Sequence, residues 1–145
     1  MTKLLEPRES SLSKPYWAAS REERLVLPYC SACADFFWYP RPVCPRCLGD
    51  ALEWREAAGK GGVHAVSVMH RPGPGRDPDA GPYAVAIVEL AEGVRMLSNV
   101  VGVAPDAVAV GATVRVAWHD LSDGRKLPVF TPDGSDGSDG SETER

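Results

Sequence analysis

Apolar and polar residues alternate with a period of two through the second half of the chain, the pattern of a half-buried β-strand. The clearest case is the segment 113–120, in which Val114, Val116 and Trp118 share one face. Turns rich in glycine, proline and aspartate separate segments of this kind. The pattern predicts five strands, over residues 63–70, 83–90, 94–101, 113–120 and 126–130, with a short helical turn or loop at 104–112.

Five short strands in such a short stretch favour a small closed barrel, because closure removes the exposed edges of a sheet. An OB-fold barrel fits the strand count. The longer connection between the third and fourth strands also fits the usual position of the helix in that fold. An SH3-like barrel and a small sandwich remain open. The predicted fold class is therefore mainly β.

The N-terminal part mixes charged and aromatic residues and predicts a short helix over residues 15–24. Ser13 can cap this helix, and proline is favourable in its first turn. Tyr16 and Trp17 are adjacent, so they do not lie on one narrow stripe. A helix this short is marginal alone. It must therefore dock either on the rest of the chain or on a partner.

The cysteines point to a metal site. All four lie within 18 residues, as the pairs Cys30/Cys33 and Cys44/Cys47. Two such pairs offer zinc a tetrahedral set of thiolates, and a complete set leaves no open position, so the expected zinc is structural. A redox pair would need a thioredoxin-like context, and disulfides would need an oxidising compartment; the chain indicates neither. Spacing alone does not exclude iron.

The segment between the two cysteine pairs, residues 35–43, is rich in aromatic residues and contains two prolines. This composition predicts a short β-hairpin between the metal-binding turns. Its aromatic side chains are better suited to a protein surface than to nucleic acid.

The distribution of charge along the chain limits the possible functions further. The chain of 145 residues has a net charge of −4, and residues 133–145, with five acids and one base, account for all of it. This Asp-Gly-Ser repeat is predicted to be disordered. The remaining residues are neutral, so they lack the basic surface of a nucleic-acid-binding protein. No segment is apolar enough for a membrane span or a signal peptide, which predicts a cytoplasmic protein.

Candidate catalytic groups are few. His64 and His70 share a strand face but lie roughly 20 Å apart along an extended strand, too far to bind one metal ion. The motifs of α/β-hydrolases, helical zinc proteases and P-loop proteins are absent from the sequence. We therefore expect no complete active site in this chain alone.

Several runs together carry a family resemblance. They are Tyr39-Pro-Arg-Pro-Val-Cys44-Pro-x-Cys47, Pro82-Tyr-Ala-Val-Ala-Ile-Val-Glu-Leu90 and Gly93-Val-Arg-Met-Leu-Ser-Asn-Val-Val-Gly102. In this order, over residues 12–132, the chain resembles the zinc-ribbon/OB-fold family of acyl-CoA-associated proteins. The resemblance implies a rubredoxin-like zinc ribbon followed by an OB-fold barrel, with one zinc ion held by Cys30, Cys33, Cys44 and Cys47.

The resemblance also implies domains and partners. The expected division is an N-terminal helical segment at 1–28, a ribbon at 29–58, a barrel at 59–132 and a tail at 133–145. Members of the family accompany thiolase-like enzymes. The implied role is an accessory subunit of an aldol lyase or acyltransferase complex, supporting retro-aldol cleavage such as steroid side-chain degradation. Two copies of each chain, with acyl-CoA near the interface, are expected.

Other roles stay open. The chain is alternatively a stand-alone acyl-CoA-binding protein, or a bridge between a thiolase and a synthase; a nucleic-acid-binding module is the least favoured. No family motif assigns an acyl-CoA contact. From their chemistry alone, the aromatic residues are expected to contact a partner or an acyl chain; they are Tyr16, Trp17, Phe37, Trp38 and Tyr39.

Overall fold

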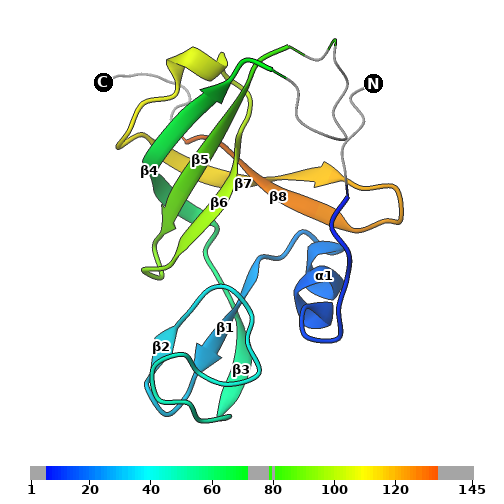
Figure 1. Ribbon diagram of the computed structural model, residues 1–145, viewed down its shortest axis with the longest axis vertical. Coiled ribbons are helices and arrows are strands. Elements are labelled where there is room, and N and C mark those ends of the chain that lie inside the picture. The colour runs from blue at the N-terminus through cyan, green and yellow to red at the C-terminus, as the bar shows by residue number, and fades with distance from the viewer. Residues whose placement is uncertain (1–5, 72–78, 80, 134–145) are drawn as a thin grey trace.

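A small ribbon and a closed barrel follow one another along the chain (Figure 1). The computed structural model describes residues 6–71, 79 and 81–133. The predicted acidic tail, apart from Asp133, lies outside the described residues. The elements are α1 (Lys14–Ser20), β1 (Val26–Cys30), β2 (Asp35–Phe36), β3 (Leu52–Glu56), β4 (Lys60–Met69), β5 (Tyr83–Leu90), β6 (Arg95–Val100), η1 (Pro105–Ala107), β7 (Thr113–Asp120) and β8 (Lys126–Pro132).

The barrel confirms the expected fold class. Its strands close in the order β4-β5-β6-β8-β7, and β7 pairs back with β4. All pairs are antiparallel except β6 with β8, which meet in parallel where Val100 faces Phe130. The five predicted strands are all present, and η1 occupies the predicted helical turn between β6 and β7. Of the barrel types left open by the sequence, this is the OB fold.

Alternation of side chains explains these strands. In β7, Val114 is fully buried while its neighbours Thr113 and Arg115 are exposed, as the period-two pattern requires. The tight connection from β5 to β6 turns at Gly93, whose φ of 91° lies in the left-handed region that glycine tolerates. In β4 the register shifts between Val63 and Ala65, which marks a bulge at His64.

The ribbon differs from the prediction. Its three strands lie in the order β2-β1-β3, so the hairpin joins β1 to β2 across the first cysteine pair. The predicted hairpin within 35–43 is wrong, since residues 37–43 contain no strand. Pro40 and Pro42 have no N–H to donate to a ladder, which explains this. The sequence reading also missed β3, which pairs along β1 from Val26 to Cys30.

The helix is shorter than predicted and ends at Ser20 rather than residue 24. The chain reverses immediately afterwards: the Arg24 N–H donates to the Ala19 carbonyl (3.1 Å), and Glu23 adopts a φ of 58°. Ser13 occupies the N-cap position, but its hydroxyl accepts from the Ser10 N–H instead of capping the helix. With seven residues, α1 depends on docking for its stability. No helix in the described part is long and apolar enough to cross a membrane.

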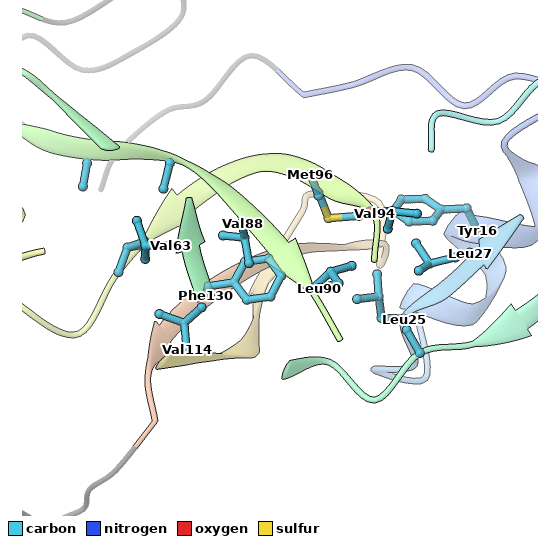
Figure 2. Close-up of a cluster of buried hydrophobic side chains, with 14 of the residues drawn as sticks. Tyr16, Leu25, Leu27, Val63, Val88, Leu90, Val94, Met96, Val114 and Phe130 are labelled. Atoms are coloured by element: carbon cyan, nitrogen blue, oxygen red, sulfur yellow. The ribbon is translucent and has the colours of Figure 1, made fainter. Parts of the chain in front are cut away.

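Ribbon, helix and barrel share one hydrophobic core. Figure 2 shows Leu25 and Leu27 of the ribbon beside Leu90 and Val94 of the barrel, with Tyr16 closing the group. The same cluster continues inside the barrel to Phe130, Val88 and Val114. Tyr16 and Trp17 both belong to it, so α1 docks on the rest of the chain.

Polar contacts fix α1 to the turn between β7 and β8. The Arg21 guanidinium donates to the Asp123 carbonyl (2.8 Å). The Ser122 hydroxyl and N–H donate to the Glu6 carboxylate at 2.8 and 3.0 Å. Lys126 pairs with Glu23 from the barrel side. These contacts fasten the helix and the segment before it to the barrel.

The connection from ribbon to barrel is tight. Gly59 has a φ of 76°, and a Cβ at this position would lie 2.6 Å from Val116 Cγ1. The Gly59 carbonyl accepts from the Val116 N–H (2.7 Å), and the preceding Ala58 N–H donates to the Glu92 carboxylate (2.9 Å). Only glycine fits this close approach in this conformation.

Candidate metal centre and apolar groove

The fold brings the four cysteine sulfurs together. All four Sγ atoms lie within 4.8 Å of one another; Cys30 and Cys47 are 3.8 Å apart, and Cys33 and Cys44 are 3.9 Å apart. A disulfide would need about 2.05 Å, and all four cysteines are free. A tetrahedron with zinc–sulfur distances of about 2.3 Å has edges of about 3.8 Å. The sulfur positions therefore fit zinc.

The two cysteine pairs have the same local structure. The residue after each pair, Ala34 after Cys33 and Leu48 after Cys47, adopts a positive φ, of 54° and 63°. This conformation turns the chain sharply around the sulfurs, although a side chain is strained in it. β1 and β3 hold the first pair in place, and the Cys44 N–H donates to the Gly49 carbonyl (2.8 Å) to close the second.

Backbone N–H groups point toward the sulfurs. The Cys33 N–H lies 3.4 Å from Cys30 Sγ, and the Arg46 N–H lies 3.4 Å from Cys44 Sγ. Hydrogen bonds from the Cys47 and Arg46 N–H groups lower the pKa of Cys44 to about 6. Such donors stabilise thiolates, the form that binds metal. Arg46 also pairs with Asp35 at the rim (3.0 Å).

The donor set defines what the ion does here. Four thiolates complete a tetrahedral shell, and no position remains for water or substrate. The ribbon has few other buried side chains with which to stabilise its loops, so one structural zinc supplies much of its folding free energy. In the described residues this is the only group of three or more potential metal ligands.

A second feature lies where α1, the ribbon and the barrel meet. An apolar groove of about 320 Å³ runs between α1, the loop 37–43, and strands β6 and β8. Of the five aromatic residues singled out in the sequence, four line it: Tyr16, Trp17, Trp38 and Tyr39. Phe37 is buried and lies outside it. The assignment of these residues to partner or acyl contacts stays a prediction.

The aromatic side chains of the groove contact one another. The Tyr16 ring lies 5.1 Å from that of Trp38 and 5.0 Å from that of Trp17, and Trp38 lies 5.2 Å from Tyr39. Burial, together with the charge of the neighbouring Tyr39, raises the pKa of Tyr16. The tyrosine is therefore a neutral hydrogen-bonding group at neutral pH.

Sequence reasoning missed the barrel wall of this groove. Met96, Leu97, Leu127 and Pro128 line it from β6 and β8. Leu97 gave a usable signal, because it occupies an outward position of its strand, where a polar residue is expected. That Leu97 and α1 line the same groove is apparent only from the folded structure.

A closed four-cysteine ribbon joined to a five-stranded barrel through a shared core defines the class: zinc-ribbon/OB-fold proteins. Two family descriptions match in the corresponding order. Residues 17–53 match the "ChsH2, rubredoxin-like zinc ribbon domain", and residues 54–119 match the "ChsH2, C-terminal OB-fold domain". The chain belongs to this ChsH2 (DUF35) family, and the family resemblance of the sequence is confirmed.

Similar solved structures and curated proteins support the same family assignment. The structure is similar to a chain of the "Ltp2-ChsH2(DUF35) aldolase", with a TM-score of 0.77 and 37% identity, covering 88% of this chain and 98% of that one. A probable enoyl-CoA hydratase alpha subunit of Thermomonospora curvata is 38% identical over 90% of this chain. The 3-oxo-4,17-pregnadiene-20-carboxyl-CoA hydratase alpha subunit of Mycobacterium tuberculosis is 43% identical over 53%.

The two hydratase subunits are much longer proteins. This chain spans 41% of the length of the Thermomonospora protein and 24% of the length of the Mycobacterium protein. The similarity is therefore to one region of each.

Proposed function

We infer that this chain is the zinc-stabilised accessory subunit of a complex with a thiolase-like enzyme that cleaves steroid side-chain acyl-CoA thioesters. The observation that carries this proposal is its match to nearly all of the ChsH2(DUF35) chain of an aldolase, at 37% identity. The steroid assignment draws support from the M. tuberculosis relative, named for a pregnadiene-carboxyl-CoA substrate. Two chains of each kind, acyl-CoA at or near the interface and a cytoplasmic location complete the proposal.

The chemistry of the described residues supports an accessory role. The candidate ligand group Cys30, Cys33, Cys44 and Cys47 is a closed shell that serves stability. The described histidines are strand residues or flank a strand, and none joins a third potential ligand. His64 lies beside Glu89 (4.0 Å) on the outer face of the barrel, where both are about half exposed. Exposed pairs of this kind are weakly coupled.

The reaction then belongs to the partner. In a retro-aldol cleavage, the β-hydroxyl loses its proton, the bond between the α- and β-carbons breaks, and the α-carbon takes up a proton. A β-hydroxyacyl-CoA thioester thus gives a ketone and a shorter acyl-CoA. The base and the group that stabilises the enolate are expected on the thiolase-like chain.

Co-expression tests the proposal. The full chain is produced with the thiolase-like protein encoded by the same organism. The complex is measured by mass, zinc content and release of ketone from a steroid β-hydroxyacyl-CoA. We expect a two-plus-two complex, about one zinc per copy of this chain, and cleavage only when both chains are present. A chain that stays alone at micromolar concentrations, or a partner that is fully active without it, contradicts the proposal.

A further inference from the structure

The apolar groove is built from three parts of the chain that lie far apart in sequence. Tyr16 comes from α1, Trp38 and Tyr39 come from the loop between the cysteine pairs, and Leu97 and Leu127 come from the barrel. A second hollow of about 210 Å³ adjoins it, and Pro40 lines both. The first hollow lies where helix, ribbon and barrel meet, and the second lies on the ribbon side of Pro40.

Large apolar side chains around the groove are open to solvent. Leu97 is 59% exposed and Tyr39 is 53% exposed, and both line the first hollow. Leu12, at 40%, lines the second. Single exposed apolar residues are ordinary, but a contiguous group around a depression marks an interaction site.

One polar group that lines the groove is buried without a hydrogen-bond partner. The Trp38 Nε1–H is buried and has no partner among the described residues. Buried polar groups are normally satisfied, and an unsatisfied one costs about 1–3 kcal/mol. An occupant that brings a hydrogen-bond acceptor to this N–H would relieve that cost.

The charge at the groove identifies the occupant further. Arg8 lines the first hollow and Arg41 the second, and neither has an ion-pair partner in the described part of the chain. Six other arginines pair with carboxylates, whereas Arg21 donates to a backbone carbonyl; the six are Arg24, Arg46, Arg55, Arg95, Arg115 and Arg125. The first hollow contains no acidic side chain. Its free cation complements a carboxylate.

We propose that the groove docks a segment of the partner protein that carries apolar side chains next to a carboxylate. The apolar side chains fill the two hollows on either side of Pro40, and the carboxylate meets Arg8. Both hollows are open and lined mainly by apolar side chains, and the acidic residues Asp50 and Glu53 line only the second. Such a surface is typical of a protein interface. A small-molecule site would instead enclose most of its ligand. This inference rests on the proposed function, because the partner is the thiolase-like chain.

Binding of surface variants tests the groove. Affinity of the full chain for the purified thiolase-like subunit is measured by calorimetry, for the wild type and for L97D, R8E and V110D. Val110 is 66% exposed and lines neither hollow, so V110D is the matched control for L97D. We expect L97D to weaken binding at least tenfold, R8E to weaken it severalfold and reduce its salt dependence, and V110D to stay within twofold. Zinc content and melting temperature show that each variant is folded.

The outcomes separate the two proposals. If the wild type binds the thiolase-like subunit and L97D and R8E bind it equally well, the groove is not the docking site. The accessory role is then unaffected. No binding by the wild type ends the accessory role and the docking site with it. Octanoyl-CoA is also titrated into the chain alone while tryptophan fluorescence is followed, since two of the four tryptophans, Trp17 and Trp38, line the groove. We expect no saturable change. A saturable change that L97D abolishes would assign the groove to an acyl group and overturn the protein-docking inference.

Discussion

The guanidinium of Arg125 lies over the indole ring of Trp17, 4.7 Å from its centroid. The two residues come from opposite ends of the chain: one from α1, the other from the turn before β8. Both are buried, and Arg125 Nε donates to the Asp123 carboxylate at 2.7 Å. The contact joins the helix to the barrel through a desolvated cation–aromatic pair.

We expect Arg125→Ala to lower the free energy of unfolding by about 2 kcal/mol, because a desolvated cation–aromatic contact and the packing of the arginine stem are lost together. Denaturant unfolding followed by tryptophan fluorescence measures this. The control is Arg95→Ala, which removes an exposed arginine paired with Glu89. That variant should change stability by less than about 0.5 kcal/mol. Equal effects of the two substitutions would show that the Trp17 contact is unimportant.

Replacing Cys44 by serine should abolish zinc binding, since three thiolates no longer complete the shell. Zinc per chain, measured by plasma mass spectrometry, should fall from about one to near zero. In an NMR spectrum, the signals of the ribbon residues should lose their chemical-shift dispersion, because the ribbon unfolds without the metal. Ser31→Ala, which removes a hydroxyl bonded to the Ala51 carbonyl, is the control in the same ribbon and should keep its zinc. Full zinc occupancy in the cysteine variant would contradict the four-thiolate site.

Leu48→Gly should stabilise the ribbon by about 1 kcal/mol, because Leu48 has a φ of 63° and glycine is not strained there. Leu48 is 72% exposed, so little packing is lost. Val110→Gly is the matched control, since Val110 is also exposed but has a negative φ, and it should be neutral or destabilising. Melting temperature and the chelator concentration needed to remove zinc report the effect. A less stable Leu48 variant would mean that the leucine side chain contributes more than its backbone strain costs.

The Asp123 carboxylate predicts a pH dependence. Desolvation raises its pKa, but the N–H and guanidinium of Arg125 and the charge of Arg21 outweigh this and lower the pKa below its ordinary value. A lowered pKa in the folded state contributes stability above the unfolded pKa of about 3.9, and the contribution disappears as pH falls through the folded value. The stability difference between the wild type and Asp123→Asn should therefore be constant from pH 7 to 5 and shrink below about pH 4.

Melting temperatures of both proteins, measured side by side from pH 7 to 3, give this difference. Both share the zinc site, so loss of zinc in acid affects them equally and cancels. A difference that grows as pH falls would have the wrong sign for a lowered pKa.

The barrel was predictable because its strands repeat a simple pattern over enough residues. In β7, Val114, Val116 and Trp118 all pack in or against the core, and Gly93 marks the turn between β5 and β6. The zinc site was predictable because four cysteines at this spacing satisfy a metal with fixed geometry. In both cases the information is local in the sequence.

The ribbon strands and the end of α1 depend on contacts across the chain. β2 is two residues long, and it exists because β1 offers it a partner, which no local preference of Asp35 and Phe36 reveals. The helix ends at Ser20 because the chain turns back through Glu23 toward β1. The groove was beyond prediction for the same reason: Tyr16, Trp38 and Leu97 meet only once the three parts have packed together.

The loop that forms one wall of the groove, with Trp38 and Tyr39, is suspended between the two cysteine pairs. Zinc affinity and groove occupancy are therefore thermodynamically linked. A partner that binds the ordered loop stabilises the metal-bound ribbon, so it must tighten zinc by the same factor by which zinc tightens the partner. The isolated chain should lose its zinc at a lower chelator concentration than the assembled complex. Zinc availability in the cell would then set how much of the complex can form.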